Sequence, residues 1–171
     1  IDKFVQTVVA ISPTFGGINL EDIKAPEAFE IETKLKEKLK IPVMHDDQHG
    51  TAIISSAALL NALEIANKKI NKVKIVISGA GASAISCAKL YVSLGVNKKN
   101  IFMFDSKGLI TTERKTLDKY KSLFAQDIKN ISLEKAMKKA DVFLGLSKGN
   151  IISKNMIKSM AKTPIVFALA N

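Results

Sequence analysis

The stretch KVKIVISGAGASAISCAKLYVSLG, residues 72–95, decides the fold. It runs from an apolar, β-branched segment through a glycine loop into a helical pattern that a further glycine ends. Gly79, Gly81 and Ala84 match G-x-G-x-x-G/A. In that pattern the first glycine permits a tight turn, the second lets backbone approach a pyrophosphate, and the small third residue lets the helix pack on the strand. The stretch therefore predicts the strand–loop–helix unit of a dinucleotide-binding domain.

The loop and the next strand supply the candidate cofactor ligands. The loop residues are Gly79, Ala80, Gly81, Ala82, Ser83 and Ala84. The unpaired N–H groups at the start of the helix favour phosphates. Asp105 ends the next strand-like run, where it can accept hydrogen bonds from ribose hydroxyls. Its charge would repel a 2′-phosphate, which favours NAD, although Ser106 and Lys107 could accommodate that phosphate and leave NADP open. The alternative is a tight strand–helix turn without a ligand.

The rest of the chain repeats the same alternation. Strands are expected at 72–78, 100–105, 141–147 and 164–170, and helices at 82–94, 113–125, 132–140 and 153–161, with Ser153 as an N-cap. The strands are apolar throughout rather than alternating, which is typical of a parallel sheet covered on both faces. We therefore predict an α/β fold with a Rossmann-like, mostly parallel sheet.

The N-terminal part predicts a separate unit. Residues 1–11 suggest a helix, residues 25–39 a helix with Pro26 at its first position, and residues 41–44 a short buried strand. Residues 51–67 read as a long helix, apolar on most faces and therefore expected to be buried.

Two acidic pairs, Glu21-Asp22 and Asp46-Asp47, each follow an apolar strand-like run. Ligands bind at the carboxyl ends of strands in open parallel sheets. Carboxylates that converge there repel one another unless a cation or proton intervenes, and hard oxygen ligands suit Mg²⁺ or Mn²⁺. The alternative is that these residues are helix caps and exposed charges, since carboxylates are stabilised at a helix N-terminus.

The histidines and the cysteine predict little chemistry. His45 and His49 are four residues apart, but a zinc site would need a third ligand, and His45 belongs to the strand rather than the helix. We expect both to be hydrogen-bonded residues that either are structural or support the ligands of a nearby site. Cys87 is expected in the core. As the only cysteine it excludes an intrachain disulfide, which fits a reducing, cytoplasmic setting.

The net charge of +10 raises the possibility of nucleic-acid binding. Arg114 is the only arginine among 26 basic residues, and arginine is the usual reader of phosphates and bases. The lysines are spread over amphipathic segments as on solvated helix faces. No apolar run approaches the roughly 20 residues of a membrane span. We expect neither a nucleic-acid nor a membrane partner.

Together these pieces resemble malic enzyme in its shorter bacterial form. The successive signatures cover essentially the whole chain: FGGINLEDIKAPEAFEIE (15–32), IPVMHDDQHGTAI (41–53), GAGASA (79–84), FDSKGLI (104–110) and FALAN (167–171). The resemblance implies oxidative decarboxylation of L-malate to pyruvate and CO₂ with NAD or NADP and Mg²⁺ or Mn²⁺. It implies that residues 1–48 are the end of a substrate and metal-binding domain and that residues 49–171 form an NAD(P)-binding domain, incomplete at its C-terminus.

The resemblance also implies residue roles. Glu21, Asp22 and Asp47 fall on the family's metal ligands, and Asp46 on the aspartate that supports the catalytic base. Asn171 falls on an asparagine that helps to hold substrate and the nicotinamide end of the cofactor. The family's catalytic tyrosine and lysine lie upstream of residue 1, so the isolated chain is expected to be an inactive central fragment of an enzyme that forms homodimers or larger assemblies.

Three rivals stay open. A malolactic enzyme would share the metal and NAD sites but release lactate. A nucleotide-binding module would bind NAD without catalysis. A two-domain dehydrogenase for amino acids or folates would share the cofactor fold but would not need the two acidic pairs.

Overall fold

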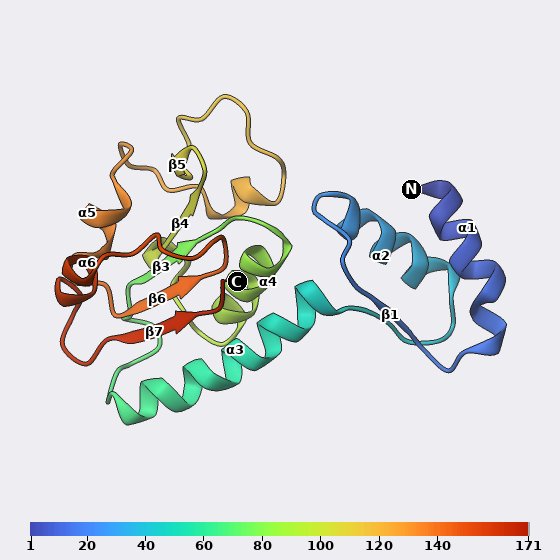
Figure 1. Ribbon diagram of the computed structural model, residues 1–171, viewed down its shortest axis with the longest axis horizontal. Coiled ribbons are helices and arrows are strands. Elements are labelled where there is room, and N and C mark those ends of the chain that lie inside the picture. The colour runs from blue at the N-terminus through green and yellow to red at the C-terminus, as the bar shows by residue number, and fades with distance from the viewer. Residues whose placement is uncertain (171) are drawn as a thin grey trace.

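The computed structural model describes residues 1–170 as two lobes joined by one long helix (Figure 1). The smaller lobe contains α1 (Asp2–Ile11), η1 (Ser12–Thr14), β1 (Ile18–Leu20), α2 (Glu27–Lys38) and β2 (Val43–His45). The larger lobe contains α3 (Asp46–Ile65), β3 (Ile75–Ser78), α4 (Ala82–Ser93), η2 (Lys98–Asn100), β4 (Ile101–Asp105), β5 (Gly108–Leu109), η3 (Lys121–Phe124), α5 (Leu133–Met137), β6 (Val142–Gly145), α6 (Lys154–Lys158) and β7 (Ile165–Ala168).

The smaller lobe is built on a pair of parallel strands. β1 and β2 pair in register from Ile18 opposite Val43 to Leu20 opposite His45, so both strands end at the same edge. The apolar faces of α1 and α2 pack with this pair around a small core. Helix α2 starts one residue after Pro26, which is its N-cap rather than its first residue. Strand β2 lies two residues later than we predicted from residues 41–44.

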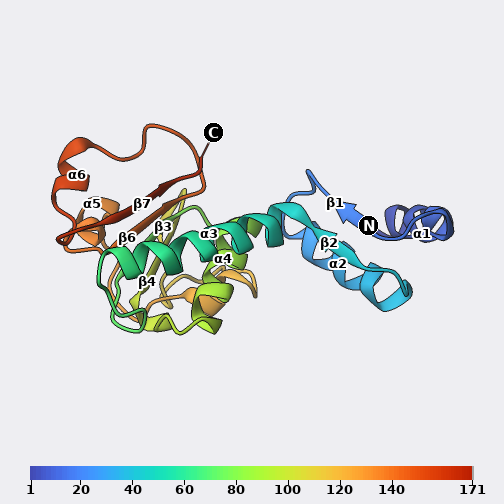
Figure 2. The same ribbon diagram turned by 90° about the horizontal axis from the view of Figure 1, so that it is seen from below.

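The larger lobe confirms the Rossmann-like prediction. Its sheet has the order β5-β4-β3-β6-β7, and all neighbours except the β4–β5 pair are parallel. Every residue of β3 and β6 is buried, as expected for strands covered on both faces. Helices α3 and α4 cover one face, and α5 and α6 cover the other (Figure 2). Ser153 caps α6 as predicted, since its side chain accepts a hydrogen bond from the Met156 N–H.

The segment after β4 differs from the prediction. No strand was predicted between residues 105 and 113, but Gly108–Leu109 forms β5, a short antiparallel strand on the edge of the sheet. The helix predicted over 113–125 is wrong: only Lys121–Phe124 forms a 3₁₀ turn. Arg114 and Asp118 hydrogen-bond to local carboxylate and backbone groups, which competes with helix formation here.

Helix α3 starts at Asp46, five residues before the predicted helix at 51, so the second acidic pair lies in its first turn. The prediction that this helix is buried is wrong for the described chain. One face packs on α4, but Ile54 is 67% exposed and Ile65 is 85% exposed. None of the helices in residues 1–170 combines the length and the apolar character that crossing a bilayer demands.

Candidate functional site

A cleft of about 1060 Å³ lies over the carboxyl ends of β3, β4 and β6. Ligand pockets usually have volumes of about 300–1,000 Å³, so this cleft is large enough for a ligand of considerable size. Its lining includes Gly79, Gly81, Asp105 and Tyr120, and α2 of the smaller lobe contributes Phe29. The cleft is therefore at the position where open parallel sheets bind ligands, and both lobes form its walls.

The glycine loop has the backbone that the motif requires. Gly79 has a φ of +124°, a conformation that L side chains rarely adopt, and a Cβ there would lie 3.1 Å from backbone atoms of Leu146. Gly81 is the N-cap of α4, and a Cβ built on it meets nothing within 4 Å. The first turn of α4 leaves N–H groups without intrahelical partners. The loop thus fits a bound phosphate, because Gly79, Ala80 and Gly81 line the cleft at the start of α4.

Asp105 ends β4 at the cleft and is already engaged by protein groups. Its two carboxylate oxygens accept hydrogen bonds from Arg114 Nη1 at 2.9 Å each, and one accepts from the Lys107 N–H. The Lys121 ammonium is 4.0 Å away. Burial acts to raise the pKa of Asp105, but the bonds from Lys107 and Arg114 and the charges of Arg114 and Lys121 outweigh it and hold the pKa below its usual value. Arg114 therefore balances the charge on which our preference for NAD rested.

The two acidic pairs meet at the edge where β1 and β2 end. The backbone N–H of Asp22 donates to Asp47 Oδ2 at 3.0 Å, across 25 residues of sequence. Asp22 has a φ of 57°, which aspartate tolerates better than most residues. Glu21, which directly precedes Asp22, is exposed. The fold therefore brings the two segments together, while convergence of their carboxylate side chains on a cation stays a prediction.

The donor set suits a hard cation, but its side chains are not closed around one. Within residues 1–170, no group of three His, Cys, Asp or Glu side chains lies close enough together to hold a metal ion. Glu21, Asp22 and Asp47 offer carboxylate oxygens of the kind that Mg²⁺ and Mn²⁺ prefer. Completing the set requires the side chains of Glu21, Asp22 and Asp47 to come closer together. The metal assignment stays a prediction.

The two parts of the site touch directly. The hydroxyl of Ser83, in the first turn of α4, donates to the backbone carbonyl of Asp47 in the first turn of α3. One turn further along α3, Gly50 leaves room for the neighbouring carboxylate: a Cβ on it would lie 2.2 Å from Asp46 Oδ1. The helix start that carries the acidic pair is thus fixed to the glycine loop, and the Asp46 side chain lies back over Gly50.

The predictions for the histidines and the cysteine are partly confirmed. His49 Nε2 lies 2.7 Å from Glu32 Oε1, as expected of a structural histidine. His45 is in β2 and fully buried, but neither ring nitrogen has a hydrogen-bond partner among residues 1–170, so that part of the prediction is wrong. Cys87 is fully buried as predicted, and burial raises the pKa of its thiol. Asn171 lies outside the described residues.

Comparison with known families identifies the fold's relatives. Residues 48–171 match the model described as malic enzyme, NAD binding domain, and residues 1–36 match malic enzyme, N-terminal domain. The chain belongs to the malic enzyme family. The predicted resemblance is confirmed, and so is the Rossmann-like fold that it implied.

Individual malic enzymes match the whole chain. It is 51% identical over its full length to an NAD-dependent malic enzyme of Rhizobium meliloti and 52% identical over 99% of its length to an NADP-dependent one of Salmonella typhimurium. It spans 22% and 23% of those two proteins. The crystal structure of an NAD-dependent malic enzyme from Thermotoga maritima matches 99% of the chain at 43% identity with a TM-score of 0.92, and the chain covers 46% of it.

Several site residues were missed from the sequence. Arg114 carried a signal, since it is the only arginine and follows Asp105 by nine residues. Gly50 carried one too, because a glycine inside a helix has a cost that calls for a reason. The contacts of Phe29 and Glu32 with the other lobe had no signal, because they depend on how the two lobes lie against each other.

Proposed function

We propose that this chain provides the cofactor cleft and the cation-binding edge of an enzyme that converts L-malate to pyruvate and CO₂ with reduction of NAD or NADP. The observation that carries the proposal is the hydrogen bond from Ser83 to the backbone of Asp47, which joins the glycine loop to the acidic pair at the start of α3. A substrate bound at those carboxylates would lie beside the nucleotide cleft. The match of 124 residues to the malic enzyme NAD-binding model, from 48 to 171, supports it.

The carboxylates at the ends of β1 and β2 are proposed to hold the cation. Asp47, Asp22 and Glu21 would supply oxygen ligands, and the Asp22 N–H would orient the Asp47 carboxylate. When bound, Mg²⁺ or Mn²⁺ supplies Lewis-acid polarisation of the substrate's carboxylate and hydroxyl oxygens. Asp46, held back over Gly50, is proposed to support a proton-transfer group from outside residues 1–171, where the resemblance expects the catalytic tyrosine and lysine.

The cleft is proposed to hold the dinucleotide along the glycine loop. The N–H groups of Ala82 and Ser83, in the first turn of α4 next to Gly81, would bind the pyrophosphate. Asp105, with Arg114, would lie at the adenosine ribose. When bound, the nucleotide supplies the hydride acceptor. Asn171 is proposed to contact substrate and nicotinamide, and residues 1–48 and 49–171 are proposed as the two domains.

Two further properties belong to the same proposal. Assembly into homodimers or larger oligomers is supported by the exposed Ile53, Ile54 and Ile65 of α3, which leave apolar surface uncovered in the described chain. Location in the cytoplasm is supported by the single, unpaired Cys87.

A malolactic reaction is the second candidate, because a Bacillus subtilis relative that is 48% identical to the chain is named a bifunctional malic/malolactic enzyme. Incubating the complete protein with L-malate, Mn²⁺ and NAD or NADP, and separating the products by chromatography, tests both. We expect pyruvate and reduced nucleotide in equal amounts. Lactate without net reduction of the nucleotide would establish the malolactic reaction. Formation of neither pyruvate nor lactate would refute the proposal.

A further inference from the structure

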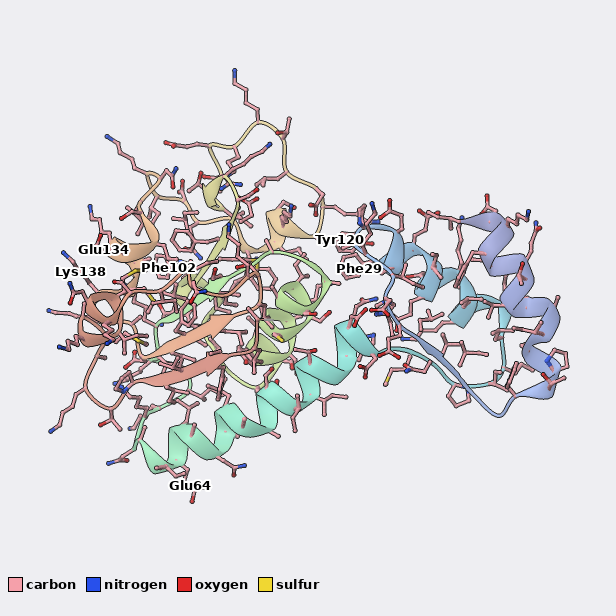
Figure 3. All side chains as sticks on the ribbon, viewed as in Figure 1. Phe29, Glu64, Phe102, Tyr120, Glu134 and Lys138 are labelled. Carbon is pink, nitrogen blue, oxygen red and sulfur yellow. The ribbon has the colours of Figure 1, made fainter. Side chains whose placement is uncertain are left out.

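Two residues one turn apart on α2 reach from the smaller lobe to the larger one. The Phe29 ring stacks on the Tyr120 ring with centroids 4.0 Å apart and an interplanar angle of 29° (Figure 3). The Lys89 ammonium of α4 lies over both rings, 5.9 and 5.4 Å from their centroids. Phe29 is only 7% exposed, although it lies where the lobes meet. The stack is therefore a buried, packed contact between the lobes and not a loose contact of exposed side chains.

The second contact comes from Glu32, three residues after Phe29 on the same helix. Its carboxylate is 8% exposed and lies 2.7 Å from His49 Nε2 on α3 and 2.8 Å from Lys36 Nζ. A buried carboxylate is costly unless it is paired, so this geometry is strongly determined. Helix α2 thus holds both the loop that carries Tyr120 and the first turns of α3.

The stack is connected to the nucleotide cleft. Tyr120 and Phe29 both line it, so the ring pair forms part of its wall. The Asp118 carboxylate accepts hydrogen bonds from the backbone N–H groups of Tyr120 and Lys121, which fixes this turn. The Lys121 side chain then reaches Asp105 at 4.0 Å. A nucleotide that contacts Asp105 or the cleft wall would therefore act on the position of the turn that carries Tyr120.

The Glu32 contact is connected to the carboxylate edge. His49 is two residues after Asp47 and in the first turns of α3, so a shift of α2 against His49 would move the start of α3. The Ser83 hydroxyl holds Asp47 from the other side. The turn that presents Asp46 and Asp47 is thus held between α2 and the glycine loop.

From these contacts we propose that α2 is a positioning helix: the Phe29–Tyr120 stack transmits nucleotide binding to the Glu32–His49 pair and so sets the affinity of the carboxylate edge for its divalent cation. This inference rests on the proposed function for the identity of the two ligands. It adds that their binding is coupled and names the residues that couple them. By linkage, the cation must then change nucleotide affinity by the same factor.

The test measures binding in the complete protein without turnover. The dissociation constant of Mn²⁺ is determined from the electron paramagnetic resonance signal of free Mn²⁺, with and without saturating NADH or NADPH, and the ratio of the two constants is the coupling factor. The variant Tyr120→Leu removes the stacked ring, and Tyr120→Phe keeps it as the matched control. Phe29→Leu removes the partner ring and serves if Tyr120→Leu does not fold, as judged by circular dichroism.

We expect a coupling factor of at least about 5 in the unsubstituted protein and in Tyr120→Phe, and a factor within about twofold of 1 in Tyr120→Leu or Phe29→Leu. A merely structural role would weaken both constants and leave their ratio unchanged. A ratio near 1 in the unsubstituted protein, or an unchanged ratio without the ring, overturns the proposal. If Mn²⁺ and nucleotide bind and couple but malate is not converted, the proposed function fails while the coupling stands.

Discussion

Replacing Gly50 with alanine separates the stability of α3 from the position of its acidic pair. Alanine in a helix interior is more favourable than glycine by about 1 kcal/mol. The added Cβ, however, would lie 2.2 Å from Asp46 Oδ1, and ordinary contact begins at 3.4 Å. The carboxylate oxygen must therefore retreat by about 1.2 Å to reach ordinary contact distance. We expect the helix to keep its stability and Asp46 to lose its position.

A misplacement of about 1 Å in an active site can cost about 100-fold in rate, and Asp46 is proposed to support the proton-transfer group there. We therefore expect kcat for malate oxidation by the complete protein to fall by about that factor in Gly50→Ala. The thermal midpoint followed by circular dichroism should stay the same or rise. Gly16→Ala is the matched control, because a Cβ on Gly16 meets nothing within 4 Å.

Two results would contradict this role of Gly50 and Asp46. Unchanged kcat in Gly50→Ala would mean that the position of Asp46 does not matter, and a midpoint lowered by several degrees would mean general damage to the helix. In an Asp46→Ala background the clash no longer exists. Gly50→Ala should then cause no further loss, and a second loss of similar size there would contradict the explanation.

Three further predictions concern single carboxylates and their partners. Asp47→Asn should weaken Mn²⁺ binding and cut turnover by orders of magnitude in the complete protein, and near-normal activity at low Mn²⁺ would exclude Asp47 as a ligand. Asp105→Ser leaves the Arg114 charge unbalanced, so the ratio of kcat/KM for NADP to that for NAD should rise by about tenfold or more; an unchanged ratio would mean that Asp105 does not set cofactor choice. Because the folded pKa of Asp105 is below 3.8, its ionised form stabilises the fold at neutral pH, and this contribution disappears as the pH falls through that lowered value. The thermal midpoint of Asp105→Asn should thus lie below that of the unsubstituted protein at pH 7 with a gap that narrows in acid, and a gap independent of pH would contradict the assignment.

The sequence predicted the elements whose signals are local. The strands of the larger sheet, the glycine loop and the Ser153 cap depend on apolar runs, backbone freedom and a side chain three residues from its partner, and all three are present. The helix expected over 113–125 failed because Arg114 and Asp118 use their side chains on groups that helix periodicity does not reveal. The prediction that α3 is buried failed because an apolar helix face does not reveal which element, if any, packs against it.

The sequence predicted which residue types lie at the strand ends, but not which side chains contact one another. The acidic pairs and the glycine motif follow strand ends, as predicted, and the cleft lies over the ends of the larger sheet. The ligands assigned to them stay predictions. The Asp22–Asp47 hydrogen bond, the Arg114–Asp105 pair and the Phe29–Tyr120 stack join segments that only the assembled fold brings together. Their partners depend on register and lobe orientation, for which a single sequence contains no direct signal.

The central claim is that one structural junction, between the start of α3 and the start of α4, holds a divalent cation beside a nucleotide. A crystal structure of the complete protein with Mn²⁺ and NAD or NADP, with the metal located by its anomalous scattering, tests it most directly. The account predicts an anomalous peak at metal-ligand distance from the Asp47 carboxylate, about 2.0–2.6 Å, and the pyrophosphate over Gly81. A metal peak away from the β1 and β2 ends, or a nucleotide bound elsewhere than the glycine loop, would contradict it.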